Sequence, residues 1–196
     1  MHFVGCGFLP QDGFWKNGYG EFGGAGNLCA WMDLYDPSSY LPYATKPMLF
    51  LSGCDDAFFE AVYRQKSADL VKGKVFYSQR SCLPHGHCWG LAHEIEAFFR
   101  HVLYGENGYM SVCEAVEQGG KVALRMDGAF AKNVRFVFTC STDEDSHKWR
   151  WESVAVEDCG GEYAHDLFAG VTAYFWEISW ECGGEIIYQS TPLYQR

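Results

Sequence analysis

One uninterrupted apolar run near position 50 most constrains the fold of this chain. Residues 47–53 read Pro-Met-Leu-Phe-Leu-Ser-Gly, with no polar residue alternating among the apolar ones. Such a run is typical of a strand buried on both faces, as in a parallel sheet covered by helices. Residues 75–77 predict a second strand, and residues 60–72 between the two have helix-forming composition, with Gly73 as a stop. The order strand, helix, strand predicts a βαβ unit.

A strongly amphipathic helix is expected next along the chain. The apolar residues Leu91, Ile95, Phe98, Phe99 and Val102 recur at helical spacing. Gly105 supplies a C-cap, and Arg100 and His101 lie near the negative end of the helix dipole. This pattern predicts a helix packed by one face against the sheet.

From about Tyr109 onward the hydrophobic period changes to two, which indicates strands with one buried face. Apolar residues alternate with others over 121–126, 134–139 and 174–180, and Gly-Gly or Asp-Gly pairs punctuate the runs at 119–120, 127–128, 160–161 and 183–184. The expected fold class is therefore α/β plus all-β. We expect an α/β domain over residues 1–106 and a small antiparallel, Ig-like β-sandwich over residues 109–196.

Charge and composition exclude some functions. The chain has 196 residues and a formal net charge of −10, so it would repel nucleic acid and anionic membranes, and no apolar run approaches the ~20 residues that cross a bilayer. Its nine cysteines are an odd number without any CxxC pair, which favours reduced thiols. The start at Met1 carries no secretory signal pattern. As written, the sequence predicts a cytoplasmic protein.

Candidate catalytic residues lie where the two predicted parallel strands end. Asp55 and Asp56 follow the first strand, and His85 and His87 follow the second. Because open α/β sheets place ligands at the carboxyl ends of their strands, these side chains are expected to be neighbours. A carboxylate that holds one imidazole nitrogen orients the other as a general base, which is the acid–base half of a hydrolase triad. Solvated or structural roles remain the alternative.

A zinc site is a weaker interpretation of the same region. Its ligands would come from Cys82, His85, His87 and Cys88, with His93 on the following helix. None of these spacings is a standard zinc motif, so neither metal nor cofactor is expected. The remaining histidines have no partner identifiable from the sequence, and surface or capping positions are expected for them; they are His2, His101, His147 and His165.

Tryptophans in the second half offer a candidate carbohydrate platform. Trp149 and Trp151 are the nearest to each other, and Trp176 and Trp180 alternate along a predicted strand. Alternation along strands favours packing in the sandwich core over an exposed platform. Trp149 and Trp151 are kept as candidate binding residues.

Several motifs, taken in order, resemble the C-terminal half of an α/β-hydrolase. They are Gly5-Cys6-Gly7-Phe8-Leu9, Asp36-Pro37-Ser38-Ser39-Tyr40-Leu41-Pro42, the run from Pro47 to Asp56, Gln65-Lys66-Ser67, and Pro84-His85-Gly86-His87. The chain is most similar to the acetyl xylan esterase-like and prolyl oligopeptidase-like bacterial hydrolases, which often carry an appended β-sandwich. Residues 148–151 also resemble that appended domain. The resemblance extends over nearly the whole chain.

This resemblance implies a role for two residues. Asp56 matches the triad acid, with Asp55 as the fallback, and His87 matches the catalytic histidine, with His85 as the fallback. The family's serine stands in a G-x-S-x-G elbow upstream of the strand that Met1 to Gly7 resembles, and no such motif occurs in this sequence. The resemblance therefore implies that this chain is a fragment, or a separately encoded part, of a serine carboxylic-ester hydrolase. Such a chain would be inactive alone.

Two expectations, about the partner and the substrate, follow from the resemblance. An N-terminal hydrolase half, or a second copy joined through the exposed sheet edge, would complete the fold. The substrate would be an ester, for example an acetylated polysaccharide, with peptide hydrolysis of the prolyl oligopeptidase type as a sibling activity. The alternative class is a non-catalytic module that binds carbohydrate or protein. A truncated N-terminus would leave the compartment unknown.

Overall fold

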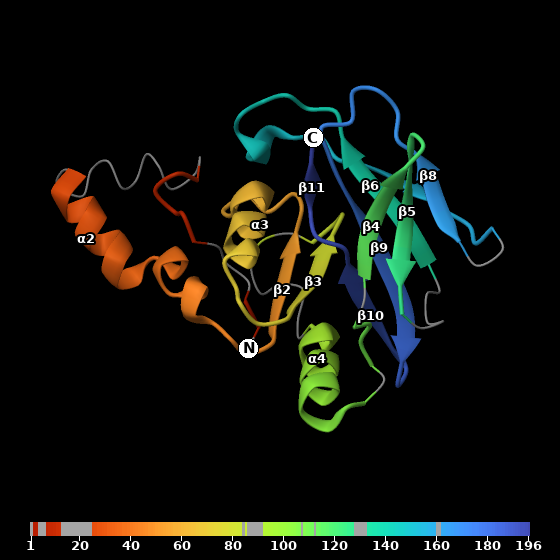
Figure 1. The fold of residues 1–196 in the computed structure, drawn as a ribbon, viewed down its shortest axis with the longest axis horizontal. Coiled ribbons are helices and arrows are strands. Elements are labelled where there is room, and N and C mark those ends of the chain that lie inside the picture. The colour runs from red at the N-terminus through yellow and green to blue at the C-terminus, as the bar shows by residue number, and fades with distance from the viewer. Residues whose placement is uncertain are drawn as a thin grey trace.

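The protein has a mixed α/β fold with two sheets (Figure 1). The structure is a computed structural model that describes residues 2–3, 7–12, 25–83, 85, 92–106, 108–111, 113–127, 133–159 and 162–196. Within these residues the helices are α2 (Ala25–Tyr35), α3 (Ala61–Asp69) and α4 (His93–Tyr104), and the 3₁₀ turns are η1 (Pro37–Ser39), η2 (Leu41–Tyr43) and η3 (Ser146–Lys148). None of the helices in these residues is long and apolar enough to cross a membrane.

The larger sheet has eight strands and mixes parallel with antiparallel pairing. Its order is β1 (His2–Phe3), β2 (Met48–Gly53), β3 (Val75–Arg80), β10 (Glu185–Ser190), β9 (Ala173–Cys182), β6 (Asn133–Thr139) and β7 (Glu152–Ala155), with β11 (Tyr194–Gln195) on β9. The strands β1, β2 and β3 are parallel, and β10 joins β3 in the antiparallel sense. Every residue of β2 is buried, as its uninterrupted apolar sequence predicts.

The smaller sheet is antiparallel and has three strands, in the order β4 (Cys113–Gln118), β5 (Lys121–Met126) and β8 (Tyr163–Asp166). The β4–β5 hairpin turns at Gly119 and Gly120, which have φ of 61° and 79°. Positive φ at both turn positions suits the twist of a hairpin and favours glycine. Strands are thus confirmed over the three alternating runs, as β5, β6 and β9, but β9 is buried on both faces rather than on one.

Strand β9 holds the core together because both of its faces are buried. Trp176 and Ile178 lie in the main core, together with Val122 of β5, while Phe175 packs in a second cluster with Cys54. The burial of Trp176 and Trp180 removes them from any exposed aromatic platform.

Helix α4 and its cap agree with the sequence, whereas α3 is shorter than expected. Gly105 has the left-handed conformation, with φ of 69°, and its N–H donates hydrogen bonds to the carbonyl oxygens of Arg100 and His101. Helix α3 ends at Asp69 rather than near residue 72. Gly73 does not cap it; instead, a Cβ at Gly73 would lie 2.3 Å from the Lys46 carbonyl oxygen, so glycine permits a close backbone approach.

Strands from both sides of the predicted boundary at residues 106–109 share the larger sheet. The main core likewise joins Leu49 and Phe98 to Phe136 and Trp176. The division into residues 1–106 and 109–196 stays a prediction. The irregular loop predicted over 13–26 falls on residues 13–24, outside the described part, and then on the start of α2.

Candidate functional site

Asp56 lies in the loop that follows β2, and its carboxylate is almost fully buried, with 7% of the residue exposed. Its Oδ1 accepts hydrogen bonds from the backbone N–H groups of Phe58, at 2.8 Å, and Phe59, at 3.1 Å. The Arg64 guanidinium lies 3.7 Å from Oδ2. These contacts fix the orientation of the carboxylate.

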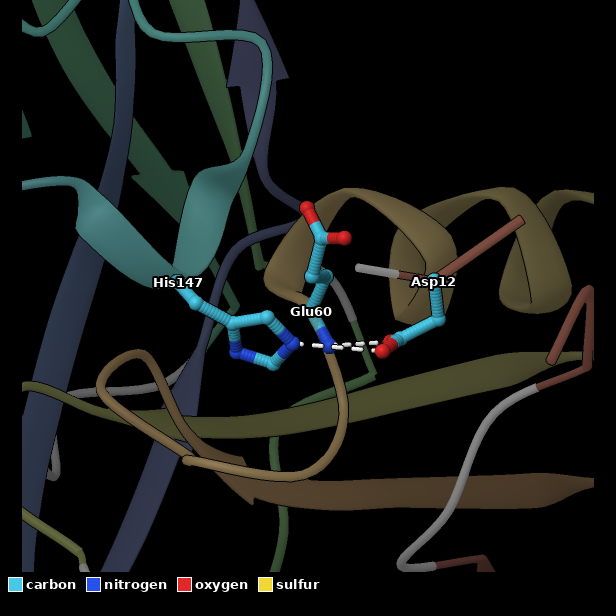
Figure 2. Close-up of side chains that lie close together, drawn as sticks. All are labelled: Asp12, Glu60 and His147. Carbon is cyan, nitrogen blue, oxygen red and sulfur yellow. Dashed lines mark hydrogen bonds and ion pairs between the residues drawn. The ribbon is translucent and has the colours of Figure 1, made fainter. Parts of the chain in front are cut away.

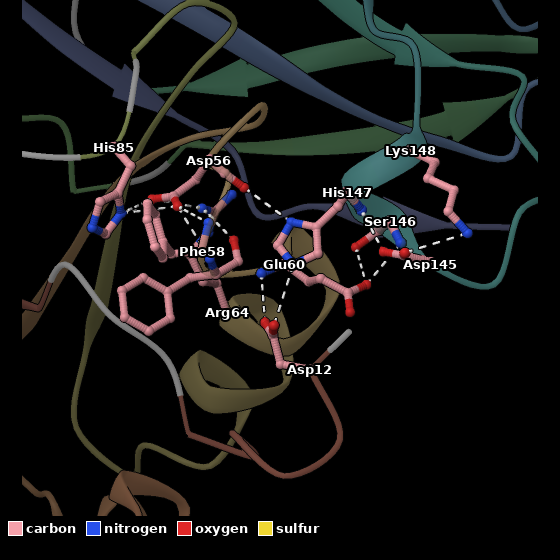
Figure 3. A network of polar contacts seen from close by, with 11 residues as sticks. Asp12, Asp56, Phe58, Glu60, Arg64, His85, Asp145, Ser146, His147 and Lys148 are labelled. Atoms are coloured by element: carbon pink, nitrogen blue, oxygen red, sulfur yellow. Dashed lines mark hydrogen bonds and ion pairs between the residues drawn. The ribbon is translucent and has the colours of Figure 1, made fainter. Parts of the chain in front are cut away.

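His85 faces this carboxylate from the loop that follows β3 (Figure 3). Its Nδ1 lies 3.0 Å from Oδ1 and 3.1 Å from Oδ2 of Asp56. The imidazole packs against the rings of Phe58 and Phe59, at centroid distances of 4.3 and 5.5 Å. The partner carboxylate and the two rings together hold the imidazole in one orientation.

Adjacent parallel strands bring the two loops together. Strands β2 and β3 are parallel and pair in register from Met48 with Val75 to Gly53 with Arg80. Both loops therefore begin at the same, carboxyl end of the two strands. Gly53 lets the loops approach closely, because a Cβ there would lie 2.0 Å from the Leu83 carbonyl oxygen. The Cys54 N–H also donates to the Arg80 carbonyl at 2.8 Å.

This geometry sets the proton positions on the imidazole. Nδ1 faces an acceptor carboxylate and therefore carries the proton, which leaves the lone pair on Nε2. None of the described residues hydrogen-bonds Nε2 of His85, and 34% of the side chain is exposed. A histidine held in this way can accept a proton from a nucleophile placed beside Nε2.

The structure thus brings Asp56 together with His85, the fallback histidine of the sequence prediction. His87, the preferred one, lies outside the described residues, as does Cys88 of the zinc alternative. Asp55 is exposed next to the dyad, and Cys82 is exposed as a free thiol. The assignment of the catalytic pair stays a prediction.

Sequence reasoning missed Arg64, which lies on α3 beneath the dyad. Its Nη1 donates to the Phe59 carbonyl at 2.9 Å, and its Nη2 donates to the Gly53 carbonyl. The guanidinium therefore ties the end of β2 to the loop that carries Asp56. The only signal in the sequence is a charged residue at a helix position four residues after Glu60, which does not reveal its burial.

A second polar cluster adjoins the dyad and contains His147, a residue for which the sequence predicted only a surface or capping position. Figure 2 shows Asp12, Glu60 and His147 close together. His147 Nε2 lies 3.2 Å from Asp12 Oδ1, and its Nδ1 lies 3.1 Å from the Asp56 backbone oxygen. One ligand atom from each of the three residues lies within 4.8 Å of the others, a spacing that suits a metal ion.

The predicted binding tryptophans lie partly buried at the edge of the second core cluster. The Trp149 and Trp151 rings are 5.8 Å apart, and Trp151 contacts Phe175 at 5.7 Å. Trp149 Nε1 donates to the Asp143 carbonyl at 2.8 Å. These contacts are those of core packing, and a carbohydrate site at this pair stays a prediction.

The described serines contribute to structure rather than to the dyad. Ser67 donates to the Tyr63 carbonyl at 2.7 Å and accepts from the Gly7 N–H at 2.8 Å. Ser38 donates to Asp36, and Ser39 donates to the Met32 carbonyl. Within the described ranges, no serine hydroxyl hydrogen-bonds His85. A serine nucleophile would have to come from elsewhere.

No protein-family model matches the chain, and no curated protein matches its sequence.

Proposed function

We propose that this chain supplies the acid–histidine half of a serine hydrolase site, with Asp56 orienting His85. The observation that carries the proposal is the contact of both Asp56 oxygens with Nδ1 of His85, at 3.0 and 3.1 Å, at the shared end of two parallel strands. In a hydrolase triad this contact fixes the tautomer and stabilises the imidazolium that forms during the reaction.

The proposed fold is the C-terminal part of an α/β-hydrolase followed by an Ig-like sandwich. The order acid then histidine, after successive strands, agrees with this fold, and the three-stranded antiparallel sheet is compatible with one layer of a sandwich. The reaction class is hydrolysis of a carboxylic ester, such as an acetyl ester of a polysaccharide. Peptide hydrolysis would use the same two residues.

Catalysis by a complete triad requires a serine that this sequence does not supply in a G-x-S-x-G elbow. We propose that an N-terminal hydrolase half, or another protein that docks at the edge of the larger sheet, provides it. His85 Nε2 would remove the serine proton, and Asp56 would hold the imidazole in place through Nδ1. The nucleotide sequence upstream of Met1 tests the first source, because a coding G-x-S-x-G elbow there would supply the nucleophile.

An activated ester tests the dyad in the chain itself. An oriented imidazole can act as a general base for water that attacks p-nitrophenyl acetate even without serine, so we expect slow p-nitrophenol release that His85→Ala lowers. Asp56→Asn should lower it as well, because an amide no longer fixes the Nδ1–H tautomer. General base catalysis accounts for about 10²-fold or more, which sets the scale of the loss.

His93 offers a matched control, because 42% of its side chain is exposed and its Nε2 also lies near a carboxylate, 3.1 Å from Glu185. His93→Ala should leave the rate unchanged. A rate that survives both His85→Ala and Asp56→Asn would remove the dyad from the reaction. Absence of any histidine-dependent turnover would favour the alternative, a non-catalytic binding module.

A further inference from the structure

We propose that Asp12, Glu60 and His147 form a binding site for a divalent transition metal such as zinc, which ties the loop carrying Asp56 to the second half of the chain. The three residues come from separate segments: Asp12 from the loop after β1, Glu60 from the N-cap of α3, and His147 from η3. The inference does not depend on the hydrolase proposal, because its tests measure metal and not ester turnover.

The contacts of the His147 imidazole call for a cation beside its Nε2. Its Nδ1 faces the Asp56 backbone oxygen at 3.1 Å, and a carbonyl only accepts, so Nδ1 carries the proton. Its Nε2 faces Asp12 Oδ1 at 3.2 Å, and this oxygen is a second acceptor. In a neutral imidazole that is protonated at Nδ1, the lone pair of Nε2 would face a lone pair of Asp12 Oδ1, and the two would repel each other. A cation between Nε2 and Oδ1 resolves the conflict, and it is either a proton or a metal ion.

The distance between these two atoms also fits a metal ion. Two ligands that each lie 2.0–2.1 Å from a tetrahedral zinc ion are about 3.3 Å apart. The observed separation of 3.2 Å between Nε2 and Oδ1 fits that distance between two zinc ligands. Glu60 offers the third candidate ligand, since one ligand atom from each of the three residues lies within 4.8 Å of the others; its carboxylate would move toward a bound ion, with a further position open to water.

All three candidate ligands make hydrogen bonds to neighbouring groups. The Asp56 carbonyl accepts from His147 Nδ1, the Glu60 N–H donates to Asp12 Oδ2 at 2.8 Å, and Ser146 donates to Glu60 Oε2 through N–H and hydroxyl at 2.7 and 2.6 Å (Figure 3). Outer contacts of this kind are typical of metal ligands, whose orientation they fix.

The donor set indicates which metals would bind. One imidazole and two carboxylates suit zinc or a neighbouring first-row ion, whereas calcium and magnesium prefer oxygen ligands alone. Asp12 and Glu60 are 0% and 3% exposed, so an ion bound between them would be shielded from water. We expect one zinc ion per chain.

The test uses the reduced, full-length chain, stripped with chelator and titrated with zinc alone by calorimetry. We expect one equivalent to bind and the melting temperature to rise. Cobalt then distinguishes the ligands: an N/O site gives no thiolate-to-cobalt charge-transfer band, whereas binding through exposed cysteines gives one. Absence of binding, or a strong thiolate band for the first equivalent, would overturn the proposal.

Variants locate the ion. Asp12→Asn should weaken zinc binding at least tenfold. Ser146→Ala, which keeps the Ser146 N–H but removes the hydroxyl contact to Glu60, should weaken it about 10- to 100-fold. His93→Gln, at the exposed His93–Glu185 pair, should leave affinity unchanged. Equal affinity in wild type and Ser146→Ala would contradict the site even if Asp12→Asn does not fold.

Nitrogen NMR of the unaltered protein separates the metal from the proton. A His147 ring that is doubly protonated, and whose signals do not move when zinc is added, would assign the cation to a proton and overturn the proposal. A shift of Nε2 at one equivalent of zinc, with Nδ1 still protonated, is the expected result.

Discussion

At the scale of single residues, the loop after β2 determines what the site can do. Asp56 accepts two backbone N–H groups and contacts His85 with both oxygens, while the backbone oxygen of the same residue contacts His147. One residue therefore links the proposed dyad to the proposed metal site. Its neighbour Cys54 is buried beneath the loop, and that burial makes its thiol testable.

Cys54 should resist alkylation in the folded protein. Burial, aided by the Asp55 charge, raises the pKa of the Cys54 thiol well above its ordinary value, so the thiolate that reacts with iodoacetamide is scarce at neutral or mildly alkaline pH. Cys82 is exposed and should react at an ordinary rate. Mass spectrometry of the labelled peptides measures both. Equal labelling of the two in native protein, as expected only after unfolding, would contradict the burial of Cys54.

At the scale of elements, the helix α4 shows how local sequence and tertiary packing combine. Its apolar stripe and its glycine cap both appear in the sequence, and Phe98 on that stripe is fully buried. The cap is a backbone requirement, since nothing lies within 4 Å of a Cβ built on Gly105 and only its positive φ opposes a side chain.

Gly105→Ala should therefore lower the free energy of unfolding by about 1–2 kcal/mol, the cost of a left-handed alanine. Gly108→Ala is the matched control, because a Cβ there would make only ordinary contacts, at 3.8 Å from the Ala97 carbonyl oxygen and 3.9 Å from the Ala97 Cβ. Urea denaturation of both variants measures the difference. Equal stability of the two would contradict the left-handed cap.

Elements with strong periodicity could be predicted from sequence, and joints between them could not. The strands β2, β5, β6 and β9 and the helix α4 follow from hydrophobic spacing alone. The junction of β10 with β3 rests on one register pair, Ser190 with Tyr77, and on the Gln79 N–H donating to Ser190 Oγ at 2.9 Å. No local sequence pattern predicts such a contact between residues far apart in the chain.

The candidate site, like the fold, could be predicted from the sequence only in part. Asp56 and a histidine of the 85–87 segment could be predicted because both follow apolar strands. His147 could not, because its partners Asp12 and Asp56 lie far away in the chain and the residues around it show no ligand spacing. Arg64 was missed because burial of a charged helix residue depends on tertiary contacts.

At the scale of the whole molecule, one core spans both halves of the chain. Tyr109 lies at the centre of this junction, with its ring 6.3 Å from Phe98, 5.6 Å from Phe76 and 6.1 Å from Trp180. Because the larger sheet also continues across the predicted boundary, local unfolding of one half would expose the core of the other.

We expect the chain to unfold in a single cooperative transition, with equal calorimetric and van't Hoff enthalpies. Phe98→Ala should destabilise this whole unit by about 3–5 kcal/mol, because it removes a fully buried ring. Leu103→Ala on the same helix is the control; Leu103 is 65% exposed, and its loss should matter little. Two separate calorimetric transitions, with only the first shifted by Phe98→Ala, would contradict a shared core.

Nitrogen NMR of the His85 ring tests most directly whether Asp56 fixes His85 as a base. We predict that the neutral ring carries its proton on Nδ1, with a strongly deshielded Nδ1 proton in hydrogen-bond contact with Asp56, and that this proton signal is lost in Asp56→Asn. A neutral His85 ring with its proton on Nε2, or a ring whose signals are unchanged by Asp56→Asn, would contradict a base oriented by Asp56.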